Sequence, residues 1–182
     1  VFPGGRIEPA DQRLGVTTNL RRDVLAKVAY GISKTRAKGL ALAAIRETFE
    51  ETGLILGHPD PRPGAAVPRA WSEFAATGHV PALDALDYIA RAITPPYRPL
   101  RFNARFFVAD ASKARGEIGG SGELANLSWL SMEEARRLPL MDITTIVLER
   151  LAQYVAAPPP PDPARPVPLY RMRHGKHGIE SE

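Results

Sequence analysis

The sequence predicts an α/β fold, built as a sandwich around a mixed β-sheet. Two segments in the middle of the chain, 88–93 and 102–109, have the alternation and the residue types of strands. Two others, 39–52 and 144–156, repeat apolar residues at the spacing of an α-helix. Strands mixed with flanking helices, and a late helix packed on them, favour such a sandwich. A length of 182 residues, with 44% apolar and 24% charged residues, suits one globular domain with a sizeable core.

The first half of the chain is expected to begin with a loop rich in glycine and to be mainly helical after it. In order, we expect a strand end and a Gly-Gly/Pro turn at 1–11, a helix at 18–30, a helix at 39–52, a loop at 57–64, and short helices at 69–77 and 81–86. Gly53 follows the second helix and is placed to end it as a C′ glycine.

The second half combines strands with two further helices. In order, we expect strands at 88–93, 102–109 and 126–130, a helix at 131–138, a helix at 144–156, and extended polyproline at 158–163. Ser131 and Glu134 have the spacing of a capping box at the start of the first of these helices. The basic tail at 164–182 either docks as an extended arm or is disordered at its tip.

Composition excludes several classes of protein. The chain has no cysteine, so disulfides and thiolate metal sites are excluded, and a cytoplasmic location is expected. It has no apolar run of the length that spans a bilayer and no visible secretory signal. The net charge of +4 is compatible with an anionic small molecule, and no basic stripe interleaved with aromatic residues indicates a nucleic-acid partner.

The most informative segment is Arg-Glu-Thr-Phe-Glu-Glu-Thr-Gly-Leu at 46–54. On a helix, Glu47, Glu50 and Glu51 fall within about 100° of one another, and the apolar residues centre on the opposite side. Three crowded carboxylates need cations among them, and oxygen ligands suit Mg²⁺ or Mn²⁺. The alternative is a solvated helix in which Arg46 and Glu50 form an i,i+4 pair.

Arg-Glu-x-x-Glu-Glu-x-Gly resembles the helical half of the Nudix box, the sequence motif of Nudix hydrolases. Val1-Phe2-Pro3-Gly4-Gly5 and the residues up to Asp11 resemble the family's Phe-Pro-Gly-Gly loop, with Asp11 where glutamate is usual. Between Asp11 and Arg46 lie 34 residues where the ordinary box has seven, which implies an insertion at about 12–38. A box interrupted in this way resembles the peroxisomal coenzyme A diphosphatase branch and its bacterial relatives.

The resemblance implies a Nudix-type α/β/α sandwich with a mixed β-sheet, whose usual N-terminal strands would be missing from this chain. It implies a Nudix domain at 1–157, followed by a Pro-rich linker and a basic tail at 158–182. It also implies divalent-metal-dependent hydrolysis of a nucleoside diphosphate linked to another group. Coenzyme A or acyl-CoA is the leading substrate. The alternatives are an ADP-ribose or NADH pyrophosphatase, and a non-catalytic nucleotide-binding regulator.

By the same resemblance, Glu47, Glu50 and Glu51 bind the metal ions, one of them accepts the proton of water, and the Gly5 carbonyl is a further ligand. Arg46 orients a glutamate instead of touching substrate. Glu8 and Asp11 either support the helix or the metals, or are solvated. A homodimer, common in the family, is left open.

Further site residues are predicted beyond the box. Glu123, six residues before Trp129, is the candidate for a general base or a supporting carboxylate, with Glu117 as the runner-up. Trp129 itself is expected to pack in the core. Substrate phosphates are assigned to basic residues around a Pro-Pro-Tyr stretch, namely Arg91, Arg101 and Arg105; the alternative for them is surface charge.

Overall fold

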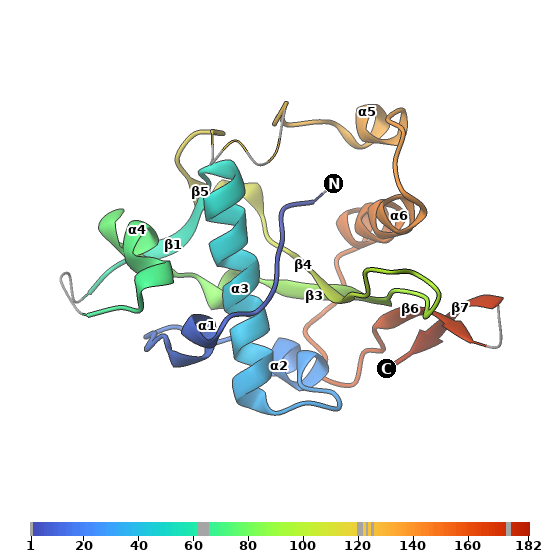
Figure 1. The fold of residues 1–182 in the computed structure, drawn as a ribbon, viewed down its shortest axis with the longest axis horizontal. Coiled ribbons are helices and arrows are strands. Elements are labelled where there is room, and N and C mark those ends of the chain that lie inside the picture. The colour runs from blue at the N-terminus through green and yellow to red at the C-terminus, as the bar shows by residue number, and fades with distance from the viewer. Residues whose placement is uncertain (1, 62–65, 120–121, 123, 125, 174–175) are drawn as a thin grey trace.

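A mixed sheet lies between helix α3 (Lys34–Thr52) on one side and helix α6 (Asp142–Ala156) on the other (Figure 1). This computed structural model describes residues 2–61, 66–119, 122, 124, 126–173 and 176–182. In that part of the chain the strand order of the sheet is β4-β3-β6-β7, with β3 (Asp87–Ile93), β4 (Asn103–Val108), β6 (Pro168–Arg173) and β7 (Lys176–Ser181). Strands β3 and β6 are parallel and the other pairs antiparallel, so the predicted α/β sandwich with a mixed sheet is confirmed.

A smaller antiparallel sheet begins with the strand that follows α3 in the sequence. Its order is β2-β1-β5, with β1 (Ile55–Pro59), β2 (His79–Pro81) and β5 (Ala114–Arg115). The remaining helices that the structure describes are α1 (Pro9–Arg13), α2 (Arg22–Val28), α4 (Ser72–Ala76) and α5 (Met132–Arg136), with single 3₁₀ turns at Arg69–Trp71, Leu83–Ala85 and Ala111–Lys113.

The sequence of α3 favours a helix in its middle and at both ends. Its middle is rich in alanine and leucine, which have high helix propensity. The Ser33 hydroxyl accepts a hydrogen bond from the Arg36 N–H at 3.2 Å and caps the start. Gly53 ends the helix with a φ of 74°, a left-handed conformation that glycine adopts without strain, as the sequence predicted.

Two apolar clusters hold the layers together on opposite faces of the sheet. The larger one joins α2 and α3 to the sheet and includes Leu42, Ile45 and Tyr88. The smaller one joins α6 to the other face and includes Ile89 and Val147. The sheet is therefore covered by helices on both sides, which is the layer order expected from the sequence.

Several predicted elements are confirmed with shifted ends, and others are wrong. The expected strand at 126–130 is wrong: these residues pair with no strand in the described part of the chain, and Asn126 has a φ of 56°. The expected strand end at 1–11 is wrong for residues 2–8, which run extended before α1 begins and pair with no strand among the residues that the structure describes. The expected loop at 57–64 starts too early, because β1 continues to Pro59.

The C-terminal tail docks as an extended arm, which was one of the two alternatives. Strands β6 and β7 form a hairpin that pairs with β3 (Figure 1), so the sheet contains residues from both sides of position 157. The domain limit at 157 stays a prediction. A cluster of ion pairs around the buried Asp87 joins the tail to the residue that precedes α2. Asp87 lies within 3.3 Å of Arg21 and 3.1 Å of Arg165, and the Tyr154 hydroxyl donates to it at 2.7 Å.

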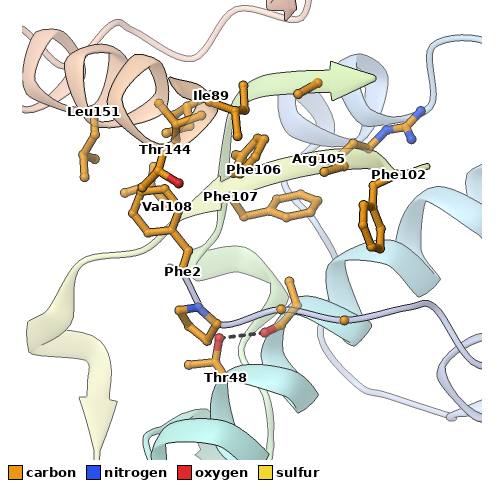
Figure 2. Close-up of a pocket in the computed structure, with 18 of the residues that line it drawn as sticks. Phe2, Thr48, Ile89, Phe102, Arg105, Phe106, Phe107, Val108, Thr144 and Leu151 are labelled. Carbon is orange, nitrogen blue, oxygen red and sulfur yellow. Dashed lines mark hydrogen bonds between the residues drawn. The ribbon is translucent and has the colours of Figure 1, made fainter. Parts of the chain in front are cut away.

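A long cleft of about 2760 Å³ separates α3 and the N-terminal loop from β4, α5 and α6. Figure 2 shows its apolar wall, where Phe2 lies near Phe106 and Val108, with Thr48 on the opposite side. The Phe2 and Phe106 rings meet edge to face at 6.2 Å between centroids. None of the helices in the described ranges combines the length and apolarity that crossing a membrane requires.

Candidate active site

The last two turns of α3 carry the acidic residues, as predicted. Residues 46–51 have helical spacing, so Arg46, Glu47 and Glu50 project toward the N-terminal loop while Ile45 packs in the core. The loop runs alongside this part of α3 (Figure 1). The site is therefore formed by one helix and the extended segment that passes over it.

Arg46 is the centre of the site. Its side chain is 3% exposed, and all five of its N–H donors have acceptors. Two donate to Asp11 in a bidentate pair at 2.9 and 3.2 Å, and one to the Arg6 carbonyl oxygen at 3.1 Å. The remaining two donate to Glu47 and Glu50, each at 2.9 Å. A fully bonded guanidinium of this kind holds its carboxylate partners in fixed positions.

Asp11 is the residue that holds Arg46. Its carboxylate is completely buried, and each oxygen accepts two hydrogen bonds. Besides the pair with Arg46, the Trp71 indole N–H donates at 3.1 Å and the Glu8 backbone N–H at 2.8 Å. Of the roles left open for Asp11, the structure therefore shows support of the helix. A hydrogen bond through Trp71 was not predicted, since 60 residues separate the two and no local pattern links them.

The two glycines of the N-terminal loop lie directly against the glutamates. The Gly4 N–H donates to Glu51 Oε2 at 2.9 Å. A Cβ atom on Gly5 would stand 2.2 Å from the Glu47 carboxyl carbon, so no larger residue fits there without displacing the carboxylate. Contact between the Gly-Gly loop and the acidic helix was implied by the resemblance, and the structure has that contact. Coordination of a metal by the Gly5 carbonyl stays a prediction.

The charges in this cluster act on one another. Burial raises the pKa of Glu50, and the negative charges of Glu47 and Glu8 act in the same direction, while Arg46 opposes them. Burial lowers the pKa of Arg46, but its bonds and charge pairs with Asp11, Glu50 and Glu47 outweigh this and raise it. Arg46 is therefore always charged, and the raised pKa of Glu50 makes its carboxylate easier to protonate than an ordinary glutamate.

The donor atoms at the end of α3 decide which metal ion the site could hold. Among the residues that the structure describes, no three carboxylate or imidazole groups converge as a metal site, and Glu47 and Glu50 each turn an oxygen toward Arg46. The chemistry of the donors nevertheless fits Mg²⁺ or Mn²⁺, since only carboxylate and carbonyl oxygens are present. The Arg46 bonds use one oxygen of each glutamate, so they leave a second oxygen on each for another role.

The predicted arginines are only partly brought together. Arg91 and Arg105 are directly opposite each other on β3 and β4. Arg101 lies exposed in the connection between these strands and lines the cleft. Arg91 donates to Glu182 at 2.6 Å, a contact across 91 residues that sequence reasoning missed.

Glu123 and Trp129 were predicted in the second half of the chain, and the structure describes only the second of them. Glu123 lies outside the described residues, so its role as a general base stays a prediction. Trp129 was expected in the core, and this is wrong: it is 65% exposed and lies at the edge of the cleft.

Comparisons with known proteins bear on the fold. No family model matches the sequence, and no curated protein matches it. Among solved structures, the chain is similar to a NUDIX hydrolase from Alicyclobacillus acidocaldarius, with 24% identity and a TM-score of 0.56. The match covers 82% of this chain and 73% of that protein. This chain shares the fold of that hydrolase. The predicted Nudix-type α/β/α sandwich is thereby confirmed as a fold.

Proposed function

We propose that this protein is a divalent-metal-dependent hydrolase that cleaves a nucleoside diphosphate linked to another group. The observation that carries the proposal is the packing of the Gly-Gly loop on the acidic end of α3, where Arg46 gathers Glu47 and Glu50. The likeness to a NUDIX hydrolase supports it through the fold. Coenzyme A or an acyl-CoA is our leading substrate, on the resemblance of the interrupted box alone.

In this proposal the residues have separate tasks. Glu47, Glu50 and Glu51, with the Gly5 carbonyl, would hold Mg²⁺ or Mn²⁺. When bound, such ions would neutralise the diphosphate oxygens and lower the pKa of the attacking water. One of the three carboxylates accepts the proton of that water. Arg46 orients two of them without touching substrate, since its five donors are already used within the protein.

A substrate panel tests the proposal. The protein is incubated with Mg²⁺ or Mn²⁺ and coenzyme A, acyl-CoA, ADP-ribose, NADH or dinucleoside polyphosphates, and the products are read by mass. We expect 3′,5′-ADP and a phosphopantetheine from coenzyme A, and a loss of about a hundredfold or more in Glu50→Gln. The matched control is Glu133→Gln, which removes an exposed carboxylate on α5 and should keep full activity.

The panel also distinguishes the alternatives. Cleavage of ADP-ribose or NADH alone would keep the mechanism and discard coenzyme A as the substrate. Bound nucleotide without turnover of any compound would favour a non-catalytic regulator. One observation speaks for that second candidate: Arg46 already pairs with Glu47 and Glu50, which neutralises part of the acidic cluster.

Two further predictions accompany the proposal. We expect a cytoplasmic protein, from the absence of cysteine. A homodimer, which the family resemblance allows, is tested by the mass of the purified protein in solution.

A further inference from the structure

Two arginines face each other on the α3 side of the sheet, which is unfavourable by itself. Arg91 on β3 is directly opposite Arg105 on β4, and like charges in this position destabilise a sheet. Arg105 also has a buried Nε with no hydrogen-bond partner in the described part of the chain. A buried donor without an acceptor costs free energy, so this pair needs a negative group beside it.

The side chain of Glu182 is that negative group. Its Oε2 accepts from Arg91 Nη1 at 2.6 Å, and its Oε1 accepts from the Tyr88 hydroxyl at 3.2 Å. The carboxylate is only 6% exposed. Two backbone hydrogen bonds with Val167, both 3.1 Å, fix the residue at the edge of the sheet.

One carboxylate does not balance the cations around it. Burial lowers the pKa of Arg105, and the positive charges of Arg91 and Arg36 lower it further, while Glu182 acts in the opposite direction. Burial and the Glu182 charge raise the pKa of Tyr88, so its hydroxyl remains a donor. Around the Glu182 carboxylate, Tyr88, Arg91 and Arg105 therefore supply an excess of positive charge and of donors, which is the arrangement that recognises a phosphate group.

Of these residues, Arg105 reaches the cleft. Arg105 and Phe102 lie on the cleft wall, and the Arg105 side chain extends along its edge in Figure 2. A ligand in the cleft can thus present an anionic group to Arg105.

We propose that Tyr88, Arg91 and Arg105 form a binding site for a phosphate group, and that the Glu182 side chain occupies this site until a phosphate displaces it. The inference rests on the proposed function, because it assigns a phosphate of the substrate to this pocket. Glu182 is then an internal competitor, and its presence lowers the apparent affinity for the ligand.

Phosphate binding without metal tests the inference separately from hydrolysis. Inorganic phosphate, ADP and 3′,5′-ADP are titrated calorimetrically into the whole protein in EDTA at constant ionic strength. We expect Glu182→Gln to bind them about tenfold more tightly than the unaltered protein, because the competitor is gone. Tighter binding of 3′,5′-ADP alone would identify a substrate phosphate, and equal gains for inorganic phosphate would identify a general phosphate site.

Two variants make the test specific. Glu180→Gln removes the neighbouring carboxylate of the same hairpin, which pairs with Arg171, and should leave the affinity unchanged. Arg105→Gln added to Glu182→Gln should abolish the gain. If Glu182→Gln binds phosphate no more tightly than the unaltered protein, Glu182 only neutralises the arginines and the inference is wrong.

A second measurement applies if Glu182→Gln does not fold. High concentrations of inorganic phosphate should raise the melting temperature of the unaltered protein, and Arg105→Gln should lose this shift. The absence of any phosphate-dependent shift in the unaltered protein would overturn the inference. In either case hydrolysis at Glu47 and Glu50 is measured independently, so failure of this pocket and failure of the proposed function are distinguishable.

Discussion

Replacement of Asp11 by asparagine should destabilise the protein strongly. The amide oxygen can keep two of the four hydrogen bonds, but the amide NH₂ would face the other two donors, one from Arg46 and one from the Glu8 backbone. Arg46 would also keep its charge at 3% exposure without its buried counter-ion. Breaking a buried pair in this way costs about 3–5 kcal/mol. For 182 residues this corresponds to a fall in melting temperature of about 8–13 °C.

The free energy of unfolding is best measured by urea denaturation with linear extrapolation. The control is Asp84→Asn, which breaks the pair between Asp84 and His58, both about half exposed, and should cost less than about 1 kcal/mol. Asp11→Glu, which introduces the residue usual in the Nudix box, should also destabilise, by about 1–3 kcal/mol, because an added methylene would displace the buried carboxylate from its four donors. A loss below about 1 kcal/mol in Asp11→Asn would refute the buried-pair account.

Two further predictions concern the Gly-Gly loop and Asp23 on α2. Gly5→Ala should lower kcat by about tenfold or more, because its Cβ would stand 2.2 Å from the Glu47 carboxyl carbon. The control is Gly15→Ala, which has open space around it and should have no effect in the same steady-state assay. At Asp23, burial raises the pKa, but the bonds and charges of Arg21 and Lys27 together outweigh it and hold the pKa below the usual 3.8. The contribution of the Asp23 charge to stability is therefore complete above about pH 4 and is lost as the pH falls through the lowered pKa. The difference in unfolding free energy between the unaltered protein and Asp23→Asn should shrink at acid pH. A difference that stays constant with pH would contradict this.

The sequence predicted what depends on local order. The acidic cluster on α3 follows from helical spacing, and the Gly53 stop and the Ser131–Glu134 capping box follow from rules that span four residues. Strands β3 and β4 were found because their alternation is strong. Resemblance to the Nudix box added that the glycine loop would lie against the helix, which no spacing argument gives.

What the sequence missed depends on contacts between distant segments. The bonds of Asp11 to Arg46 and to Trp71 join residues 35 and 60 positions apart, and the Tyr88–Glu182 contact spans 94. Pairing of the tail with β3 is equally non-local, so the sequence alone does not choose between a docked and a disordered tail. The wrong strand at 126–130 has strand-like composition but no partner strand beside it in the described residues, which shows that pairing, not propensity, decides a strand.

The central claim is that the acidic end of α3 holds a divalent ion. Calorimetric titration of Mn²⁺ into the unaltered protein, Glu50→Gln and the control Glu133→Gln measures this most directly. We expect binding that Glu50→Gln weakens by about tenfold or more and that Glu133→Gln leaves unchanged. Equal Mn²⁺ affinity in all three proteins, or no binding to the unaltered one, would contradict the account.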